Sequence, residues 1–552
     1  MDNLLTPARI GWAVGIVCVT LVVRFLQRLH YHRRLVKGLP GPPHSYLFGH
    51  ILSMGKVLAA QPRRAAPQTF PIMVKEKYDL GDYFYVDAWP LNPDPIMMIF
   101  DTDIMHELTV KQSMPKAQVV DDFLQNFGGP GNLVSAEGAV WKKWRSAFNP
   151  GFSQSHLMTL VPAIVDECTI FCDIQARHAK NNDLFRMERD TTRLTVDIIG
   201  KVILDFPLDS QRGPNELVDA FMSQCKWQAK GAQFNPIELI DFPVRYVVQQ
   251  YNNFTMNRYI SARLEERFAS RHTREKSKAV IDLALEAYLK EKGKSGDLAN
   301  SKTMDPEFKQ AAISNMKTFI FAGHDTTSST LCYAYYYLSK NPETLAKIRQ
   351  EHSDVFGPDQ STVGDQLKQD PRLLNRLDYT LAVTREVLRC QPPASTVRTG
   401  QKGFFVHDPA TGDPLPTDGF TLWPVDVGVH RSSKYWPDPH VFRPERHLHH
   451  AADSSANYNS KEAWIAFSKG PRNCIGQELA VIETKAILAM TVRRFDFAPA
   501  FDELEKLRGD GSGYPSDTSG VQEQFGDEAY QIQLGAAKPR EGMPCRIRLR
   551  DI

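Results

Sequence analysis

The sequence predicts a mainly α-helical fold with small β-sheets, preceded by a single N-terminal transmembrane helix. Apolar residues recur every three or four positions in three long segments, residues 194–203, 263–292 and 308–339, and this is the period of a helix. Short β-prone runs lie nearer the two ends, and residues 10–23 are uncharged and mostly apolar. With 552 residues, 42% of them hydrophobic, the chain is long enough to bury one large core or two medium ones.

The N-terminal stretch IGWAVGIVCVTLVV (residues 10–23) is followed by an arginine and two more apolar residues. These seventeen residues would form a helix of about 25 Å, against about 30 Å for the hydrocarbon core, so the flanking arginines would have to snorkel. A cleaved signal peptide is the alternative, but the basic residues follow the apolar run and no small-x-small site is present. The positive-inside rule predicts an uncleaved anchor, residues 1–37, with the remaining chain in the cytosol. Residues 38–44, GLPGPPH, predict a proline-rich hinge before a folded domain of residues 45–552.

Two hairpins are expected near the ends of that domain. Residues 83–90 and 95–101 are β-prone and flank the turn signal LNPD, which predicts the first hairpin. Alternating apolar residues at 530–534 and 545–549, with Pro and Gly between them, predict that these two segments pair as the second.

Charge and cysteine usage narrow the function classes. The formal net charge is only +2, and the chain contains no long run of basic residues, which argues against a nucleic-acid partner. Eight cysteines are scattered without zinc-finger spacing, as expected in a reducing compartment. Cys168 and Cys172 lie one helical turn apart and are expected to pack in the core.

The segment FSKGPRNCIG, residues 467–476, surrounds Cys474 with what a metal-binding thiolate needs. Gly470 and Gly476 permit turns that aim backbone N–H groups at the sulfur, and the helix predicted after the loop adds its N-terminal dipole. Arg472 can pair with a carboxylate of a bound group, and Phe467 can pack over its ring and keep water from the sulfur. The alternative is a buried structural cysteine, the ordinary fate of an isolated thiol.

This loop resembles the haem-binding loop of the cytochrome P450 superfamily, with the pattern Phe, two residues, Gly, one residue, Arg, one residue, Cys, one residue, Gly. All five fixed positions are present. The resemblance implies the single prism-shaped cytochrome P450 fold, with residues 45–552 as the catalytic domain. It also implies haem b, whose iron takes an axial thiolate from Cys474.

The motif AGHDTT, residues 322–327, places an acid and a hydroxyl in a long apolar helix, where burial of both is costly. A threonine inside a helix often returns its hydroxyl to the carbonyl four residues earlier and loosens the turn, and Gly323 leaves room beside it. The resemblance assigns Thr326 to a hydrogen bond with dioxygen and Asp325 to proton delivery. The alternative is a polar notch satisfied by water.

Glu386 and Arg389 lie three apart on a predicted helix and could form an ion pair. The pair Glu505 and Arg508 has the same spacing and is expected to be an ordinary surface contact. The resemblance implies that Arg446 joins Glu386 and Arg389 in a buried network that supports the haem side of the core.

Three histidines, His447, His449 and His450, are of the residue type that binds zinc, but no acidic or cysteine ligands complete the set, and exposed histidines are expected instead. His447 also departs from the pattern of many relatives, which carry an aromatic residue there.

The motif WKKWR places the indole of Trp141 and the guanidinium of Arg145 four residues apart on a helix, suited to gripping a carboxylate. The resemblance implies that these residues contact a haem propionate and that Arg398, with Arg472, is a further propionate partner.

The resemblance is strongest to filamentous-fungal members that oxidise polyketides and terpenoids in secondary metabolism. It implies a monooxygenase of the endoplasmic reticulum membrane that inserts one atom of dioxygen into a hydrophobic small molecule. No dinucleotide or flavin fingerprint appears, so electrons are expected from a separate NADPH-dependent reductase. Lys142, Lys143 and Lys469 are candidates for its docking face. The alternatives are a haem-thiolate isomerase or dehydratase, and a non-catalytic membrane protein that binds haem or lipid.

Overall fold

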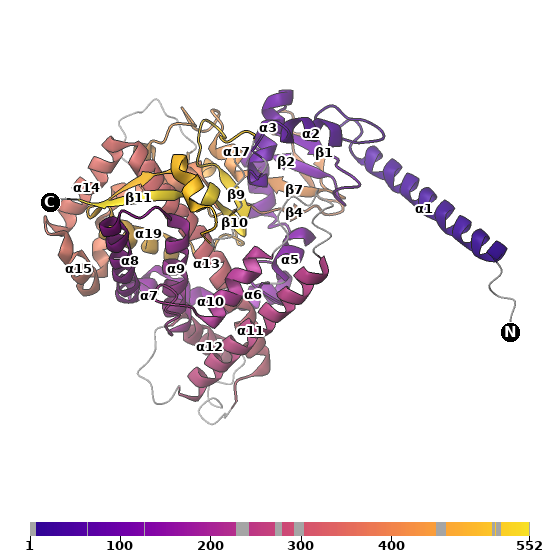
Figure 1. Cartoon of the computed structure of the whole chain (residues 1–552). Helices are drawn as coiled ribbons and strands as arrows, with labels where there is room; N and C mark the ends of the chain where they lie inside the picture. Colours follow the sequence, from indigo (N-terminus) through magenta and orange to yellow (C-terminus); the bar gives the residue numbers. More distant parts are fainter. Residues whose placement is uncertain are drawn as a thin grey trace. The chain divides into compact units, whose positions relative to one another are not determined.

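The computed structural model describes residues 7–62, 64–125, 127–227, 242–270, 279–291, 303–448, 460–510, 514 and 520–550. The chain forms two compact units (Figure 1). The first comprises residues 1–61, 69–117 and 397–425, and the second comprises residues 62–68, 118–396 and 426–552.

The first unit contains one long helix, three short helices and a four-stranded sheet. Its helices are α1 (Pro7–Leu35), α2 (Ile51–Leu58), α3 (Phe70–Tyr78) and α4 (Thr102–His106), and its strands are β1 (Tyr83–Val86), β2 (Ile96–Ile99), β4 (Arg398–Thr399), β5 (Phe405–His407), β6 (Pro414–Pro416) and β7 (Thr421–Pro424). The sheet order is β1-β2-β7-β4, and β5 pairs separately with β6. Strands β1 and β2 are antiparallel with Tyr83 opposite Ile99, so the first predicted hairpin is confirmed. Strand β7 runs parallel to β2 and antiparallel to β4, which brings the remote segment around Arg398 into this sheet.

Helix α1 is longer than the apolar stretch that predicted it. Its segment Gly11–Leu35 has a mean hydropathy of 1.6 in its most apolar window and is long enough to cross a membrane. The C-terminal end of α1 is held against the rest of the first unit, because the buried Arg33 guanidinium pairs with Asp87 and donates to the carbonyl of Trp89 at 3.1 Å. The proline-rich segment is bonded to β1, since the amide of Tyr85 donates to the carbonyl of Pro40 at 2.8 Å. The boundaries 1–37, 38–44 and 45–552 stay predictions.

The second unit is mainly helical (Figure 1). Its helices are α5 (Gln118–Gln125), α6 (Gly138–Phe148), α7 (Gln154–Met158), α8 (Val161–Asn181), α9 (Met187–Ile199), α10 (Glu216–Lys226), α11 (Phe242–Ala269), α12 (Val280–Glu291), α13 (Pro306–Lys340), α14 (Pro342–Phe356), α15 (Val363–Gln369), α16 (Asp378–Cys390), α17 (Asp426–His430), α18 (Ser460–Ala463) and α19 (Gln477–Thr491). The three-stranded sheet β3 (Phe185–Arg186), β11 (Pro544–Leu549) and β8 (Phe495–Pro499), and the pair β9 (Gln531–Leu534) and β10 (Ala536–Pro539), complete it. Cys168 and Cys172 are buried in α8, as expected.

Helix α13 is the long buried helix of this unit, and it confirms the helix predicted over residues 308–339. Asp305 caps its N-terminus by accepting from the amides of Glu307 and Phe308. The helix predicted over residues 263–292 is wrong as one element. Helix α11 ends at Ala269, Ser270 forms a turn, and α12 begins only at Val280.

The second predicted hairpin is also wrong. Strand β9 pairs with β10, an element absent from the sequence interpretation, while β11 pairs with β8 and β3. The reason is Gly535, whose φ of +82° provides a tight turn directly after Leu534. The alternating pattern identified both strands but not their partners, because a strand with one buried face can pair with any strand of matching pattern.

Gly400, which follows β4, tests how tightly the backbone is packed in the first unit. A Cβ atom at that position would lie 1.6 Å from the carbonyl oxygen of Thr417, so Gly400→Ala forces the backbone to move. We expect the free energy of unfolding to fall by about 1–3 kcal/mol, the usual cost of overpacking. Denaturant titration of the solubilised full chain measures this change. Gly55→Ala is the matched control, because its Cβ would meet no atom within 4 Å, and an equal loss there would contradict the explanation.

Candidate active site

The segment around Cys474 is a tight loop that leads into α19. The amide of Cys474 donates to the carbonyl of Phe467 at 3.0 Å, and the amide of Asn473 donates to that of Gly470 at 3.1 Å. Gly470 has a φ of +76°, which favours glycine, and Gly476 is the N-cap of α19. The loop therefore places the cysteine at the start of a helix, as the sequence predicted.

Opposing effects act on the pKa of the Cys474 thiol. Burial by the surrounding protein raises the pKa of its thiol, whereas the backbone N–H of Gly476 and the charge of Arg145 lower that pKa. The Cys474 side chain is nevertheless exposed on one side, in contrast to the buried Cys168 and Cys172. A cysteine that is supported by a backbone donor and open on one face can bind a metal.

Helix α6 holds this loop from the side. The guanidinium of Arg145 donates to the backbone carbonyl and to the side-chain oxygen of Asn473, both at 2.9 Å. Arg472 lies over the ring of Trp141, 4.8 Å from its centroid, and its Nη1 pairs with Glu137 at 2.9 Å. The structure thus brings Trp141, Arg145 and Arg472 together beside Cys474. The sequence interpretation missed Asn473 and Glu137, since a single Asn or Glu carries no pattern of its own.

The ring of Phe467 contacts the indole of Trp464 edge-on, with 5.8 Å between centroids. The structure therefore shows one neighbour of this ring, while its proposed contact with a bound group stays a prediction.

Thr326 and Asp325 are adjacent on α13 but differ in environment. The hydroxyl of Thr326 donates to the carbonyl of Ala322 at 2.7 Å, the back-bond that its position predicted. Ala322 is exposed although it lies in the middle of a buried helix, so this turn borders open space. Gly323 allows close packing instead, since a Cβ there would lie 2.2 Å from a methyl group of Ile199 on α9.

Asp325 is buried, and its carboxylate is bound to the C-terminal strand β10. Its Oδ2 accepts from the amide of Ala536 at 2.6 Å, and its Oδ1 pairs with Lys538 at 2.5 Å. The sequence interpretation did not find Lys538, because more than two hundred residues separate it from Asp325 and no motif contains it.

The predicted network around Glu386 is present within the second unit. Its carboxylate pairs with Arg389 at 2.8 Å and with Arg446 at 3.0 Å. His447 joins them at 2.9 Å and is buried, so the expectation that it is exposed is wrong. The physical reason is that the Glu386 carboxylate has room for a further donor, which the imidazole supplies.

The remaining expectations about this region have mixed outcomes. Glu505 and Arg508 form an exposed pair, as expected. His449 and His450 lie outside the described residues, and within the described part of the chain no cluster of His, Cys, Asp and Glu is arranged to hold a metal ion. Lys142 is exposed, whereas Lys143 pairs with Glu307 and Lys469 pairs with Glu462.

Arg398 belongs to the first unit, where β4 holds it. Its side chain is buried and its Nη1 donates to the carbonyl of Met114 at 2.9 Å. Its expected role as a propionate partner stays a prediction.

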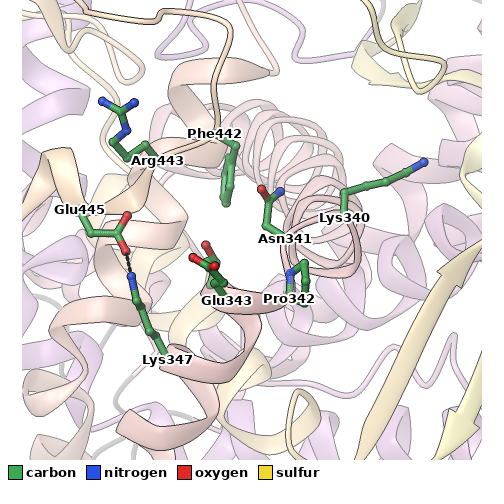
Figure 2. Close-up of a pocket in the computed structure, with 9 residues that line it drawn as sticks. Lys340, Asn341, Pro342, Glu343, Lys347, Phe442, Arg443 and Glu445 are labelled. Atoms are coloured by element: carbon green, nitrogen blue, oxygen red, sulfur yellow. Dashed lines mark hydrogen bonds and ion pairs between the residues drawn. The ribbon is translucent and has the colours of Figure 1, made fainter.

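A separate hollow of about 470 Å³ lies where α13 meets α14 (Figure 2). Most of its lining is polar, and two of its charged side chains, Lys347 and Glu445, pair at 2.6 Å. Neither Cys474 nor Thr326 lines it. This hollow is therefore distinct from the candidate active site.

Comparison with known proteins identifies the family of this chain. The sequence model of the family described as Cytochrome P450 matches residues 39–517. The chain is 38% identical over 550 residues to the cytochrome P450 monooxygenase polC of Polytolypa hystricis, which covers 98% of this chain and 96% of that protein. It is 36% identical over 508 residues to the cytochrome P450 monooxygenase acrF of Aspergillus aculeatus, and the matched region covers 89% of this chain and 99% of that protein. It is 27% identical over 514 residues to human cytochrome P450 4Z1, and the matched region covers 88% of this chain and 91% of that protein.

The chain therefore belongs to the cytochrome P450 family and is a cytochrome P450 monooxygenase. The family implies a haem held by a cysteine thiolate, and electrons supplied by a reductase. The residues of this site fit such a group, because an accessible sulfur with a backbone donor lies beside the cations Arg145 and Arg472.

Glu386 provides a test of the supporting network. Burial alone would raise the pKa of its carboxyl, but Arg389 and His447 outweigh burial and hold that pKa well below its ordinary range. This stabilisation is present at neutral pH and is lost progressively as the pH falls below the ordinary carboxyl range. We expect Glu386→Gln to lower the free energy of unfolding at pH 7 by about 3–5 kcal/mol, with a smaller difference from wild type at acid pH.

Denaturant titrations at several pH values measure that difference. Glu505→Gln is the control, because its pair with Arg508 is exposed and should contribute little. A loss for Glu386→Gln that does not change with pH would contradict the electrostatic explanation.

Proposed function

We propose that the thiolate of Cys474 would hold the iron of haem b in this monooxygenase. The observation that carries the proposal is the Cys474 loop, with an accessible sulfur, the Gly476 N–H directed at it and Arg145 bonded to the adjacent Asn473. When bound, a haem-thiolate activates dioxygen and favours cleavage of its O–O bond. Trp141, Arg145, Arg398 and Arg472 would hold the propionates of the haem, and Phe467 and Gly476 would lie on the side of the cysteine sulfur.

Two residues of α13, Thr326 and Asp325, take part in hydrogen bonding and proton transfer to dioxygen. Thr326 holds a hydroxyl at the exposed turn of the helix, where it donates to the carbonyl of Ala322 and its oxygen can accept a further hydrogen bond as dioxygen takes up protons. Asp325 precedes it and relays a proton, taking it up on its carboxylate and passing it on so that one oxygen atom leaves as water. The position of Thr326 beside the exposed Ala322 supports this role.

The electrons come from a separate NADPH-dependent reductase in the same membrane. The apolar segment Gly11–Leu35 supports a single-pass anchor, and the basic residues at its C-terminal end favour a cytosolic catalytic domain. The membrane is that of the endoplasmic reticulum. Lys142, which is exposed, contributes to the docking face more readily than Lys143 and Lys469, whose charges are paired.

The substrate is a hydrophobic small molecule, a polyketide or terpenoid intermediate of fungal secondary metabolism, which the enzyme hydroxylates, epoxidises or desaturates. Similarity over nearly the whole chain to monooxygenases of Polytolypa hystricis and Aspergillus aculeatus supports this class. Comparing metabolites of a producing strain with those of a strain lacking the gene identifies the compound that accumulates. If no compound accumulated, the proposed pathway role would be wrong.

Replacing Cys474 by Ala tests the ligand assignment. We expect the variant to lose turnover and the red-shifted Soret band that a thiolate-ligated haem shows after reduction and treatment with carbon monoxide, because no other side chain of the loop supplies a thiolate. Cys18→Ala is the matched control, since Cys18 is also an exposed cysteine. Retention of the band in the Cys474 variant would overturn the assignment.

Thr326→Ala tests the handling of protons. Without the hydroxyl, reduced oxygen escapes as hydrogen peroxide, so we expect the yield of product per NADPH to fall by about tenfold or more. Peroxide and product are measured against NADPH consumed, with the substrate found by metabolite comparison. Thr330→Ala is the control, because its hydroxyl makes the same back-bond one turn later, to the carbonyl of Thr326, from a buried position. Equal product yields in wild type and Thr326→Ala would contradict this role.

A further inference from the structure

Lys538 is a buried cation at the centre of a cluster of charged side chains in the second unit. Its ammonium pairs with Glu188 of α9 and with Asp325 of α13, each at 2.5 Å. The exposed fractions of Lys538, Glu188 and Asp325 are 2%, 3% and 1%. Lysine is rarely buried to this extent unless it is paired, and here one ammonium serves two carboxylates.

The cluster links the C-terminal hairpin to α13 directly before Thr326. Gly535 lies at the turn between β9 and β10, and a Cβ there would come within 2.4 Å of Asp325 Oδ2. The same oxygen accepts from the amide of Ala536, so each oxygen of Asp325 is held by a different group of the hairpin. The carboxylate can therefore neither rotate nor withdraw without breaking a charge-assisted bond.

Glu188 has its own partners in addition to Lys538. The hydroxyl of Tyr514 donates to its Oε2 at 2.5 Å, and the hydroxyl of Thr192 donates to its Oε1 at 3.0 Å. Although burial would raise the pKa of Glu188, the Lys538 charge and these bonds lower it. Glu188 therefore stays ionised and keeps Lys538 charged.

We propose that Lys538 is a positioning residue of this monooxygenase, which acts through Asp325 by holding its carboxylate in place beside Thr326. The proposal rests on the proposed role of Asp325. It extends that role to the C-terminal hairpin, since the hairpin supplies both groups that hold the carboxylate.

The titratable groups around Lys538 and Asp325 determine the effect of removing the cation. They are Glu188, His324, Tyr514, Cys225 and Cys332. His324 Nε2 lies 3.4 Å from Asp325 Oδ1, and burial, together with the charge of Lys538, lowers the pKa of this imidazole and favours its neutral form. Burial raises the pKa of the Tyr514 hydroxyl and of both thiols, so these groups are neutral as well.

Lys538→Met therefore leaves two buried carboxylates without a cation. At pH 8 both would have to stay charged or take up a proton from dilute solution, whereas at pH 5 protonation is easier. We expect the melting temperature of the variant to lie furthest below that of wild type at pH 8, and the difference to narrow toward pH 5. A packing role for the lysine stem would give a difference that does not change with pH.

The double variant Asp325→Asn with Lys538→Met separates positioning from a second, independent role. If Lys538 acts through Asp325, Lys538→Met lowers the yield of product per NADPH in the wild-type background by about the same factor as Asp325→Asn does. It then lowers the yield no further once Asp325 is replaced. A further loss in the double variant would overturn the proposal.

Two controls keep these results interpretable. Lys368→Met removes a lysine whose pair with Asp166 is exposed, and neither its melting temperature nor its yield should shift beyond error. If Lys538→Met gives no folded protein at pH 8, the triple variant E188Q/D325N/K538M, which removes all three charges, must restore folding, and failure to do so counts against the proposal.

The red-shifted Soret band distinguishes failure of this proposal from failure of the proposed function. It should persist in Lys538→Met and in Asp325→Asn, because neither residue belongs to the Cys474 loop. Absence of the band in the wild type would overturn the haem-thiolate assignment, whereas the pH dependence of the melting temperature tests the charge cluster without reference to haem.

Discussion

The structure depends first on how the sulfur of Cys474 is kept available. A thiolate surrounded by protein is unfavourable, and burial accordingly raises the pKa of this thiol. Two features oppose that effect: the N–H of Gly476 at the start of α19, and the charge of Arg145 on α6. Both require the loop to keep its shape, and the two bonds from Arg145 to Asn473 fix it. The proposed iron binding at this position would thus depend on one short loop and the two helices that enclose it.

The rest of the second unit can be understood as support for that loop and for the α13 turn at Thr326. Glu386 joins α16 to the segment that carries Arg446 and His447 through a largely buried set of ion pairs and hydrogen bonds. Lys538 joins the C-terminal hairpin to α13 and α9 by similar means. Buried charges are costly to leave unpaired, so each set specifies one arrangement of its elements more strictly than apolar contacts would. The polar groups inside this helical core therefore determine the geometry of the site more than they add to its stability.

The sequence predicted the features that local chemistry determines. The spacing around Cys474, the back-bond of Thr326 and the pair of Glu386 with Arg389 all depend on residues close together in the chain. Partners from distant segments were not predictable. Lys538 reaches Asp325 only because Gly535 turns the chain into β10, and His447 reaches Glu386 across sixty-one residues. The second hairpin failed for the same reason, since alternation identifies a strand but not the strand it pairs with.

The central claim is a bond between iron and the Cys474 sulfur, and X-ray absorption at the iron edge of the purified full chain tests it most directly. The chain should be produced with hemin supplied during expression, so that cofactor shortage does not limit occupancy. We predict iron with one sulfur and four porphyrin nitrogens among its nearest neighbours. Iron with only nitrogen and oxygen neighbours, or properly folded protein that contains no porphyrin, would contradict that claim.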